Sequence, residues 1–275
     1  MEDNLLYSDA DFRRVQNIAM REAGIWLQDT KRDLVESRLA RIVRGNGCKS
    51  YAELLNLAES SGGSEILTKL VFAITTNVTN FFREKVHFDH LQAEVIAPAA
   101  GAIRKGKRFR VWSSACSSGQ EGWSMAMSVM TVIPDASQYD VKILGTDINA
   151  DMVKIARSGS YRRQDTDGIP EVLKKKWLLP ASDDHLVFSG DICALPTFNP
   201  MNLNGEWPFR GTFDAIFCRN VVIYFDAKTK ARLWERLSGR LNPGGFIYVG
   251  HSERIGDPLS CGLEPVSSTI YRKIR

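Results

Sequence analysis

Small residues and an acid follow an apolar run in VWSSACSSGQEGWS, residues 111–124. This order of residue types predicts a strand, a tight turn and the first turn of a helix. Small side chains let backbone N–H groups approach a ligand closely, and a helix N-terminus favours the negative charge of a carboxylate or a phosphate. The glycine spacing departs from GxGxxG, leaving Gly119, and the GKS or GKT of a P-loop is absent. Dinucleotide and nucleoside-triphosphate binding are therefore disfavoured.

Two acids stand where a ligand would meet the predicted strands. Asp147 ends the next apolar run, ILGTD, 28 residues after Gly119, and doubly wound folds place an acid there against ribose hydroxyls. Asp147 could instead cap the helix that begins NADMV, although Asn149 could cap that helix and leave Asp147 for a ligand. Glu121 could contact the ligand, or it could serve only as a first-turn acid that complements the helix dipole.

The residues that usually bind metals do not form a pattern. The five cysteines are widely scattered without a CxxC pair, and His87 and His90 lie three residues apart without a third ligand nearby. We therefore expect free thiols, ordinary surface histidines and no metal site.

The elements that must position the two acids change in character along the chain. Residues 1–90 carry apolar side chains at helical spacing, punctuated by glycines, which is typical of a small helical bundle. From about residue 108, apolar strand runs alternate with amphipathic helices, which implies a parallel, doubly wound sheet with its ligand at the carboxyl ends of the strands. We expect a helical domain over residues 1–90 and an α/β domain over residues 91–275.

A further excursion is expected inside the α/β domain. About fifty residues separate the helix NADMVKIARSG from the strand run FDAIF, more than one strand and one helix usually need. Residues 174–191 resemble a short hairpin, and a strand resumes near residues 196–203. We predict a small β insertion at about residues 165–195.

Composition narrows the class of protein. Hydrophobic residues make up 44% and charged residues 25% of the chain, which is typical of a folded globular protein. The N-terminal MEDNLLYSDADF lacks the basic start and apolar run of a signal peptide, and no segment approaches the 18 apolar residues of a membrane span. We expect a cytoplasmic protein without membrane insertion.

Positive charge is concentrated in one predicted helix. Residues 31–49 hold six cations and two anions, a local excess that equals the net charge of +4. Apolar residues of this helix share a sector about 100° wide, which is the size of a core-facing stripe: Val35, Leu39, Ile42 and Val43. Cations fall together on a different side: Lys31, Arg38, Arg41 and Arg44. The helix therefore presents either a surface for an acidic partner or a merely solvated charged face.

Six segments, in order from about residue 70 to residue 254, resemble the CheR family of chemotaxis receptor methyltransferases. They are ITTNVTNFFREKVHF, VWSSACSSGQEGWS, ILGTDINADMVKIARSGSYR, MNL, FDAIFCRNVVIYF and LNPGGFIYVGHSE. The first 70 residues match the family only in helical character and size. The resemblance implies a class I methyltransferase doubly wound mixed sheet with a small β insertion, preceded by a small all-α N-terminal domain. It also implies transfer of a methyl group from S-adenosylmethionine to glutamate side chains of chemotaxis receptors, which yields S-adenosylhomocysteine.

Site residues follow from the resemblance, motif by motif. Cofactor contacts are expected from the following residues: Asn77, Thr79, Arg83, Glu121, Asp147, Asn202, Leu203, Asn220 and Val221. Without the resemblance, Asn77 and Thr79 would pass as helix-boundary residues. Arg83 and Tyr224 are the catalytic candidates that would orient the accepting carboxylate, and the alternative for Tyr224 is a core aromatic. Substrate contacts are assigned to the cations of the charged helix: Lys31, Arg38, Arg41 and Arg44.

The expected partner is a chemotaxis receptor. The resemblance implies the cytoplasmic helical region of methyl-accepting chemotaxis receptors and no nucleic acid. Family members that tether to a receptor's C-terminal pentapeptide share a glycine-containing extension of the β insertion. Here WLLPASDDHLVF is short and lacks that glycine, so we expect a tether-independent enzyme, and we expect a monomer. The alternatives are a class I methyltransferase acting on another protein, RNA or a small molecule, and a cofactor-binding regulator. RNVVIYF, in place of an Asn-Pro-Pro-Tyr-like turn, argues against an amine-methylating RNA enzyme.

Overall fold

The computed structural model describes residues 5–75 and 78–274. Contacts divide the chain into two units. The first contains Met1–Asn77 and Tyr224–Thr229, and the second contains Val78–Ile223 and Lys230–Arg275. The division falls at Asn77, not at the expected residue 90, because side chains such as Phe81 and Phe88 are buried in the core of the second unit.

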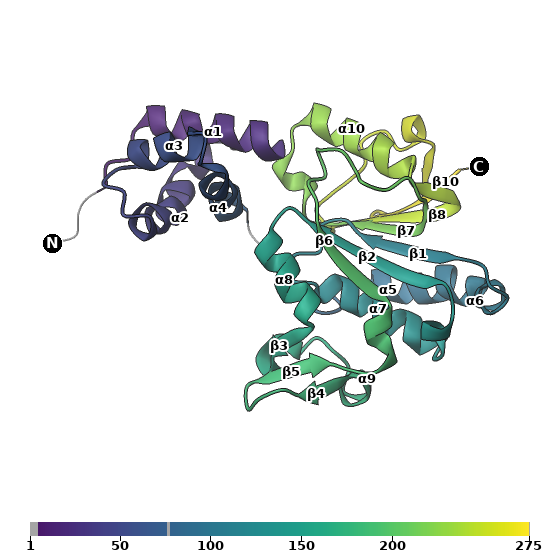
Figure 1. The fold of residues 1–275 in the computed structure, drawn as a ribbon. Helices are drawn as coiled ribbons and strands as arrows, with labels where there is room; N and C mark the ends of the chain where they lie inside the picture. The colour runs from purple at the N-terminus through teal and green to yellow at the C-terminus, as the bar shows by residue number, and fades with distance from the viewer. Residues whose placement is uncertain (1–4, 76–77, 275) are drawn as a thin grey trace. The chain divides into compact units, whose positions relative to one another are not determined.

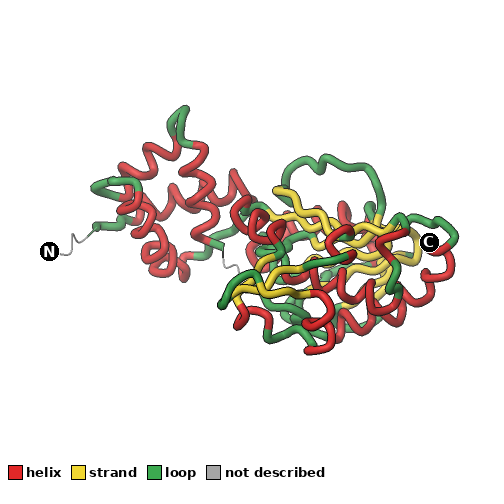
Figure 2. Tube along the Cα trace, turned by 60° about the horizontal axis from the view of Figure 1, so that its bottom comes forward, coloured by secondary structure: helices red, strands yellow, loops and turns green. Residues whose placement is uncertain are grey.

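The first unit is a helical bundle, drawn in red with green loops in Figure 2. Its helices are α1 (Asp9–Ala23), η1 (Asp29–Lys31), α2 (Arg32–Gly45), α3 (Tyr51–Glu59) and α4 (Ser64–Ile74). Ser8 caps α1 through a capping box with Asp11. Helix α1 ends before Gly24, its C-cap residue, which takes a left-handed conformation with φ of 67°. Ile25 instead forms an isolated antiparallel bridge with Phe225.

The charged helix α2 buries the face predicted from its spacing. Val35, Leu39 and Val43 are buried, and Ile42 is half-buried. The apolar stripe packs within the bundle, where α2 contacts α3 and α4.

The second unit contains a seven-stranded sheet in the order β6-β2-β1-β7-β8-β10-β9. The strands are β1 (Phe109–Ser113), β2 (Val141–Asp147), β6 (Pro196–Pro200), β7 (Phe213–Cys218), β8 (Leu241–Val249), β9 (Leu263–Pro265) and β10 (Ile270–Lys273). The five strands from β6 to β8 pair in parallel, whereas β10 pairs antiparallel with β8 and with β9. The sheet is thus mixed, as the family resemblance implied, because the last two strands form a hairpin.

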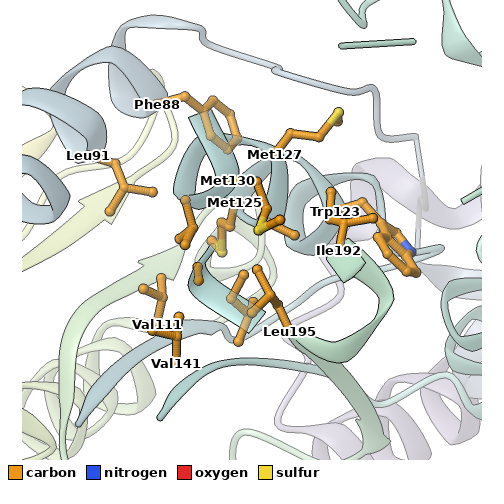
Figure 3. Close-up of a cluster of buried hydrophobic side chains, with 14 of the residues drawn as sticks. Phe88, Leu91, Val111, Trp123, Met125, Met127, Met130, Val141, Ile192 and Leu195 are labelled. Atoms are coloured by element: carbon orange, nitrogen blue, oxygen red, sulfur yellow. The ribbon is translucent and has the colours of Figure 1, made fainter. Parts of the chain in front are cut away.

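Helices cover both faces of the sheet, with α6 and α7 on one side and α10 on the other in Figure 1. The helical segments of this unit are α5 (Val86–His90), η2 (Leu91–Ile96), α6 (Ala97–Arg104), α7 (Gln120–Val132), η3 (Ala136–Gln138), α8 (Ala150–Ser158), η4 (Arg163–Thr166), α9 (Glu171–Trp177), η5 (Asp191–Ala194) and η7 (Leu259–Cys261). Two further segments, η6 (Val222–Tyr224) and α10 (Ala227–Ser238), include residues of the range 224–229, which is grouped with the first unit. Figure 3 shows Met125 and Met130 of α7 gathered with Val111, Val141 and Leu195 in the core between helix and sheet.

The predicted β insertion is present as a separate three-stranded antiparallel sheet in the order β3-β5-β4. Its strands are β3 (Ser160–Arg162), β4 (Leu178–Pro180) and β5 (His185–Phe188). Phe188 stacks on Trp123 of α7 with ring centroids 4.2 Å apart, which anchors the insertion to the core. Among the described residues, none of the helices combines the length and apolar composition needed to cross a membrane.

Candidate functional site

Asp147 joins the carboxyl ends of β1 and β2. One carboxylate oxygen accepts the backbone N–H of Ser117 at 2.8 Å, and the other accepts that of Asn149 at 2.9 Å. The side chain of Asn149 caps α8 by accepting from Asp151 and Met152. Asp147 is therefore not the cap of α8. Each of its oxygens retains a lone pair for a further donor such as a ribose hydroxyl, and burial raises the pKa of this carboxyl above its usual value despite the two N–H donors.

The turn before α7 requires glycine, because side chains of the same domain pack closely against it. Gly119 is the N-cap residue of α7 and has φ of 95°. A Cβ there would lie 2.6 Å from the Cβ of Ala156 and 2.9 Å from the hydroxyl of Tyr161. Because glycine has no side chain to accept the first N–H groups of α7, these donors are left for a ligand anion.

Glu121 lies in the first turn of α7 but does more than complement its dipole. Its Oε1 accepts the hydroxyl of Ser113 at 2.7 Å, and its Oε2 accepts Nη1 of Arg219 at 3.0 Å. The side chain is 13% exposed. Burial raises the pKa of Glu121 above its usual value, although the adjacent guanidinium and the Ser113 hydroxyl oppose this effect.

The segment from Thr79 to Lys85 carries unusual backbone geometry. Phe82 and Glu84 have φ of 51° and 57°, a left-handed conformation that costs free energy for residues with a Cβ. Among the described residues, Ser117 and Asn220 are the other non-glycine positions of this kind. These four residues lie in the segments after β1, after β7 and before α5 that carry the predicted site residues. Strain of this kind concentrates at functional sites.

Glu84 forms the centre of a polar group beside that segment. Its Oε2 lies 3.3 Å from Nη2 of Arg219 and 3.5 Å from Nδ1 of His87, and its Oε1 lies 3.3 Å from Nδ1 of His251. Burial alone would raise the pKa of Glu84, but Arg219 and the bonds from His251 outweigh burial and hold the pKa below its usual value.

His87 is not the surface histidine that the sequence led us to expect. It is 1% exposed, and its Nε2 lies 2.8 Å from the hydroxyl of Thr269. Burial, together with the nearby charge of Arg219, lowers the pKa of His87 to about 4. His90 is half-buried with its Nδ1 2.9 Å from the hydroxyl of Tyr248. Both rings therefore pack from α5 against Tyr248 of β8.

Asn220 and Val221 follow β7 in a turn held by an acid that the sequence analysis did not single out. Glu253 is 4% exposed and accepts the backbone N–H groups of Asn220, Val222 and Gly250 at 2.7, 3.0 and 2.8 Å. These three hydrogen bonds and the left-handed backbone conformation of Asn220 hold the turn in place. The only sequence signal for Glu253 was its position at the end of the family segment LNPGGFIYVGHSE.

Asn202 and Leu203 follow β6, the strand next to β2. The side chain of Asn202 accepts the backbone N–H of Asn204 at 2.9 Å, and the side chain of Leu203 is buried. The preceding Met201 N–H donates to the carbonyl of Asp147 at 2.8 Å. The structure thereby brings the Asn202 turn beside the end of β2.

The remaining candidates differ in how the structure places them. Thr79 and Arg83 are half-buried, and Nη1 of Arg83 donates to the carbonyl of Val78 at 2.9 Å. Asn77 lies outside the described residues. Tyr224 groups with the first unit, where its carbonyl accepts the N–H of Trp26 at 2.7 Å.

The four cations assigned to substrate binding also differ from one another. Lys31 ends η1, and Arg41 and Arg44 are on α2; all three are exposed. Arg38 is half-buried, and its Nη1 donates to the carbonyls of Ala73 and Thr75 at 3.1 and 3.2 Å. Arg38 therefore stabilises the C-terminal end of α4.

The strand-end groups fit S-adenosylmethionine. This molecule carries an ammonium and a sulfonium cation, one carboxylate and a ribose. Buried carboxylates at Glu121 and Asp147 suit the cationic groups and the ribose hydroxyls, and the start of α7 after Gly119 suits the carboxylate. In the described part of the chain, histidine, cysteine and acidic side chains form no group of three that could hold a metal ion.

Known proteins resemble the chain over nearly its whole length. The family model of the CheR methyltransferase SAM-binding domain matches residues 77–270, and that of the CheR methyltransferase all-alpha domain matches residues 10–75. A probable chemotaxis protein methyltransferase of Rhizobium etli is 39% identical, over 91% of this chain and 95% of that protein. The chemotaxis protein methyltransferases of Borreliella burgdorferi and Escherichia coli are 34% and 35% identical, over 98% and 92% of this chain and 96% and 87% of their own lengths.

Proposed function

Because the chain belongs to the CheR family of S-adenosylmethionine-dependent methyltransferases, we propose that it methylates glutamate side chains of chemotaxis receptors. The acceptors are carboxylates in the cytoplasmic helical region of these receptors, and the products are glutamate methyl esters and S-adenosylhomocysteine. The observation that carries this proposal is the full-length similarity to chemotaxis protein methyltransferases. Buried acids at the ends of β1 and β2 support it independently.

The reaction makes modest demands on the protein. S-adenosylmethionine supplies an electrophilic methyl group on a sulfonium. A glutamate side chain has an unperturbed pKa near 4.3, so at neutral pH it is already the nucleophile and needs no general base. The protein must align the carboxylate and exclude water, and such positioning supplies roughly 7 to 11 kcal/mol.

Within this proposal, Asp147 binds the ribose, and Glu121 meets the cationic amino-acid end of the cofactor. Contributions from Asn77, Thr79, Asn202, Leu203, Asn220 and Val221 complete the cofactor site. Arg83 and Tyr224 orient the accepting carboxylate. A tight ion pair from Arg83 would stabilise the ground-state anion and slow the attack, so Arg83 is proposed to steer the acceptor without clamping it.

Receptor recognition is assigned to the N-terminal helical domain. The exposed cations Lys31, Arg41 and Arg44 are placed to attract a receptor helix that carries glutamates. Arg38 acts indirectly, because its guanidinium donates to the carbonyls of Ala73 and Thr75. The enzyme is proposed to act in the cytoplasm as a monomer. It is also proposed to act without a pentapeptide tether, because the loop between β4 and β5 is short.

Transfer of a labelled methyl group from S-adenosylmethionine to receptor-containing membranes tests this function. The expected product is labelled receptor from which mild base releases methanol, because esters are base-labile and amides or N-methyl groups are not. A base-stable label, or label on RNA or a small molecule with none on receptors, would refute the proposed substrate. Receptors with acceptor glutamates changed to alanine are the matched control.

A further inference from the structure

Arg219 ties together three segments that are distant in sequence. It follows β7 and is 5% exposed. Its Nη1 donates to Glu121 of α7 at 3.0 Å, and its Nη2 donates to the carbonyl of Arg83 at 2.5 Å. The same Nη2 lies 3.3 Å from Oε2 of Glu84. A single guanidinium thereby holds the start of α7, the strained segment before α5 and the end of β7.

The charges around Arg219 do not cancel. Two carboxylates, Glu84 and Glu121, face one guanidinium, while His87 is neutral at physiological pH because its pKa is lowered to about 4. When both acids are ionised, the group carries a net charge of about minus one. Burying a second carboxylate beside one cation is costly unless a further cation arrives. The arrangement is therefore complementary to a cationic ligand.

Both terminal nitrogens of Arg219 already donate to protein partners. The central carbon of its guanidinium lies 5.8 Å from the ring centroids of both Phe88 and Phe217. Glu121 retains partial exposure, at 13% of its side chain, whereas the side chain of Arg219 is 2% exposed. The carboxylate can meet a ligand, and the guanidinium acts through it.

We propose that Arg219 is a positioning residue for the cofactor. It keeps the carboxylate of Glu121 ionised and aimed at the ammonium end of the cofactor, and it fixes the main chain of Arg83. This inference rests on the cofactor site of the proposed function and adds to it a residue that acts without touching the cofactor.

The proposal has a distinctive consequence for pH. The groups facing Glu121 are Arg219, Glu84, the Ser113 hydroxyl, and the thiols of Cys116 and Cys218, which burial keeps neutral by raising their pKa. Arg219 is thus the cation that opposes the rise in pKa caused by burial of Glu121. Without Arg219 the pKa of Glu121 rises further, so the carboxyl takes up its proton at a higher pH than in the unchanged chain. Cofactor affinity would then fall as pH is lowered and recover as pH is raised.

The test measures binding of S-adenosylhomocysteine, which retains the ammonium group, by titration calorimetry between pH 6 and 8.5. The full-length chain is compared with Arg219→Met, Arg219→Lys, Glu121→Gln and the double variant Arg219→Met/Glu121→Gln. Arg110→Met is the matched control, because it removes another arginine–carboxylate contact, that to Asp140, at the opposite end of β1. Urea unfolding of each variant reports its stability separately.

Arg219→Met is expected to lose at least tenfold in affinity at pH 7 and to regain part of it at pH 8.5. Arg219→Lys restores the charge without the forked geometry, so it recovers part of the affinity and flattens the pH dependence. Glu121→Gln loses affinity without that dependence, and adding Arg219→Met to it costs little more. Arg110→Met binds like the unchanged protein.

Equal losses for Arg219→Met at every pH, or losses that add fully in the double variant, would overturn the proposal and leave Arg219 a structural residue. If Arg219→Met does not fold, the pH profile of Arg219→Lys decides, since an unchanged affinity and profile refute the inference. No receptor is needed, so this result stands apart from the receptor assay. A chain could fail to methylate receptors and still show the pH-dependent binding.

Discussion

Asp147 offers a direct test of the cofactor site, because its carboxylate has both a structural and a proposed ligand role. Asp147→Ala removes the acceptors of two backbone N–H groups, those of Ser117 and Asn149. Leaving a buried donor unpaired costs roughly 1 to 3 kcal/mol, so the two together cost about 2 to 6 kcal/mol of stability. Asp147→Asn keeps one acceptor oxygen and should lose about half as much.

Loss of the ribose contact adds a separate effect on binding. A lost hydrogen bond to the ribose costs about 1 to 3 kcal/mol, which corresponds to roughly 5- to 150-fold weaker binding. Urea unfolding measures the first effect. Titration calorimetry with S-adenosylhomocysteine, at a temperature where both variants are folded, measures the second.

Asp151→Ala is the control for this experiment. Asp151 lies four residues further on, in the first turn of α8, and pairs with Lys154 at 2.8 Å on an exposed surface. Its removal should cost less than about 1 kcal/mol and leave binding unchanged. If Asp147→Asn and Asp147→Ala lose stability but bind S-adenosylhomocysteine as tightly as the unchanged chain, the carboxylate only holds the turn, and the ribose assignment is wrong.

Three further outcomes follow from the geometry. Gly119→Ala should lose about 2 to 5 kcal/mol of stability in calorimetric unfolding, because φ is 95° and the new Cβ would lie 2.6 Å from a side-chain carbon of α8; an unchanged melting temperature would contradict this. The double variant Arg41→Ala/Arg44→Ala should raise the Michaelis constant for receptor and weaken the salt dependence of that constant. Arg38→Ala should instead lower the stability of the protein. An unaltered salt dependence in the double variant would mean that α2 has only a structural role. The pKa of His87 is depressed from 6.5 to about 4 in the folded state, so its contribution to stability is complete above pH 6.5 and is lost as pH falls toward 4. His87→Gln should therefore flatten the acid side of the stability profile, and an equally steep fall in that variant would argue against this cause.

Local patterns in the sequence specified most of the elements. Apolar spacing in α2, the Ser and Asn caps, and the alternation of strands with helices are short-range signals, because each reflects backbone geometry within a few residues. The positions of Glu121 at the start of α7 and of Asp147 at the end of β2 could be predicted for the same reason. A parallel crossover then requires those ends to meet at one edge of the sheet.

Only the tertiary structure revealed what surrounds those acids. Arg219 meets Glu121 98 positions away and the Arg83 carbonyl 136 positions away, and no local pattern encodes such pairings. The same holds for Glu253, which satisfies three backbone donors across a turn. His87 was misjudged because its helix α5 is too short to show periodicity, and its burial depends on contacts with β7, β8 and Thr269. Residue types and local spacing thus determined the elements and the acids at their ends. Desolvation and long-range ion pairing, which exist only in the packed chain, decided how the pKa values of those acids shift and which residues hold them.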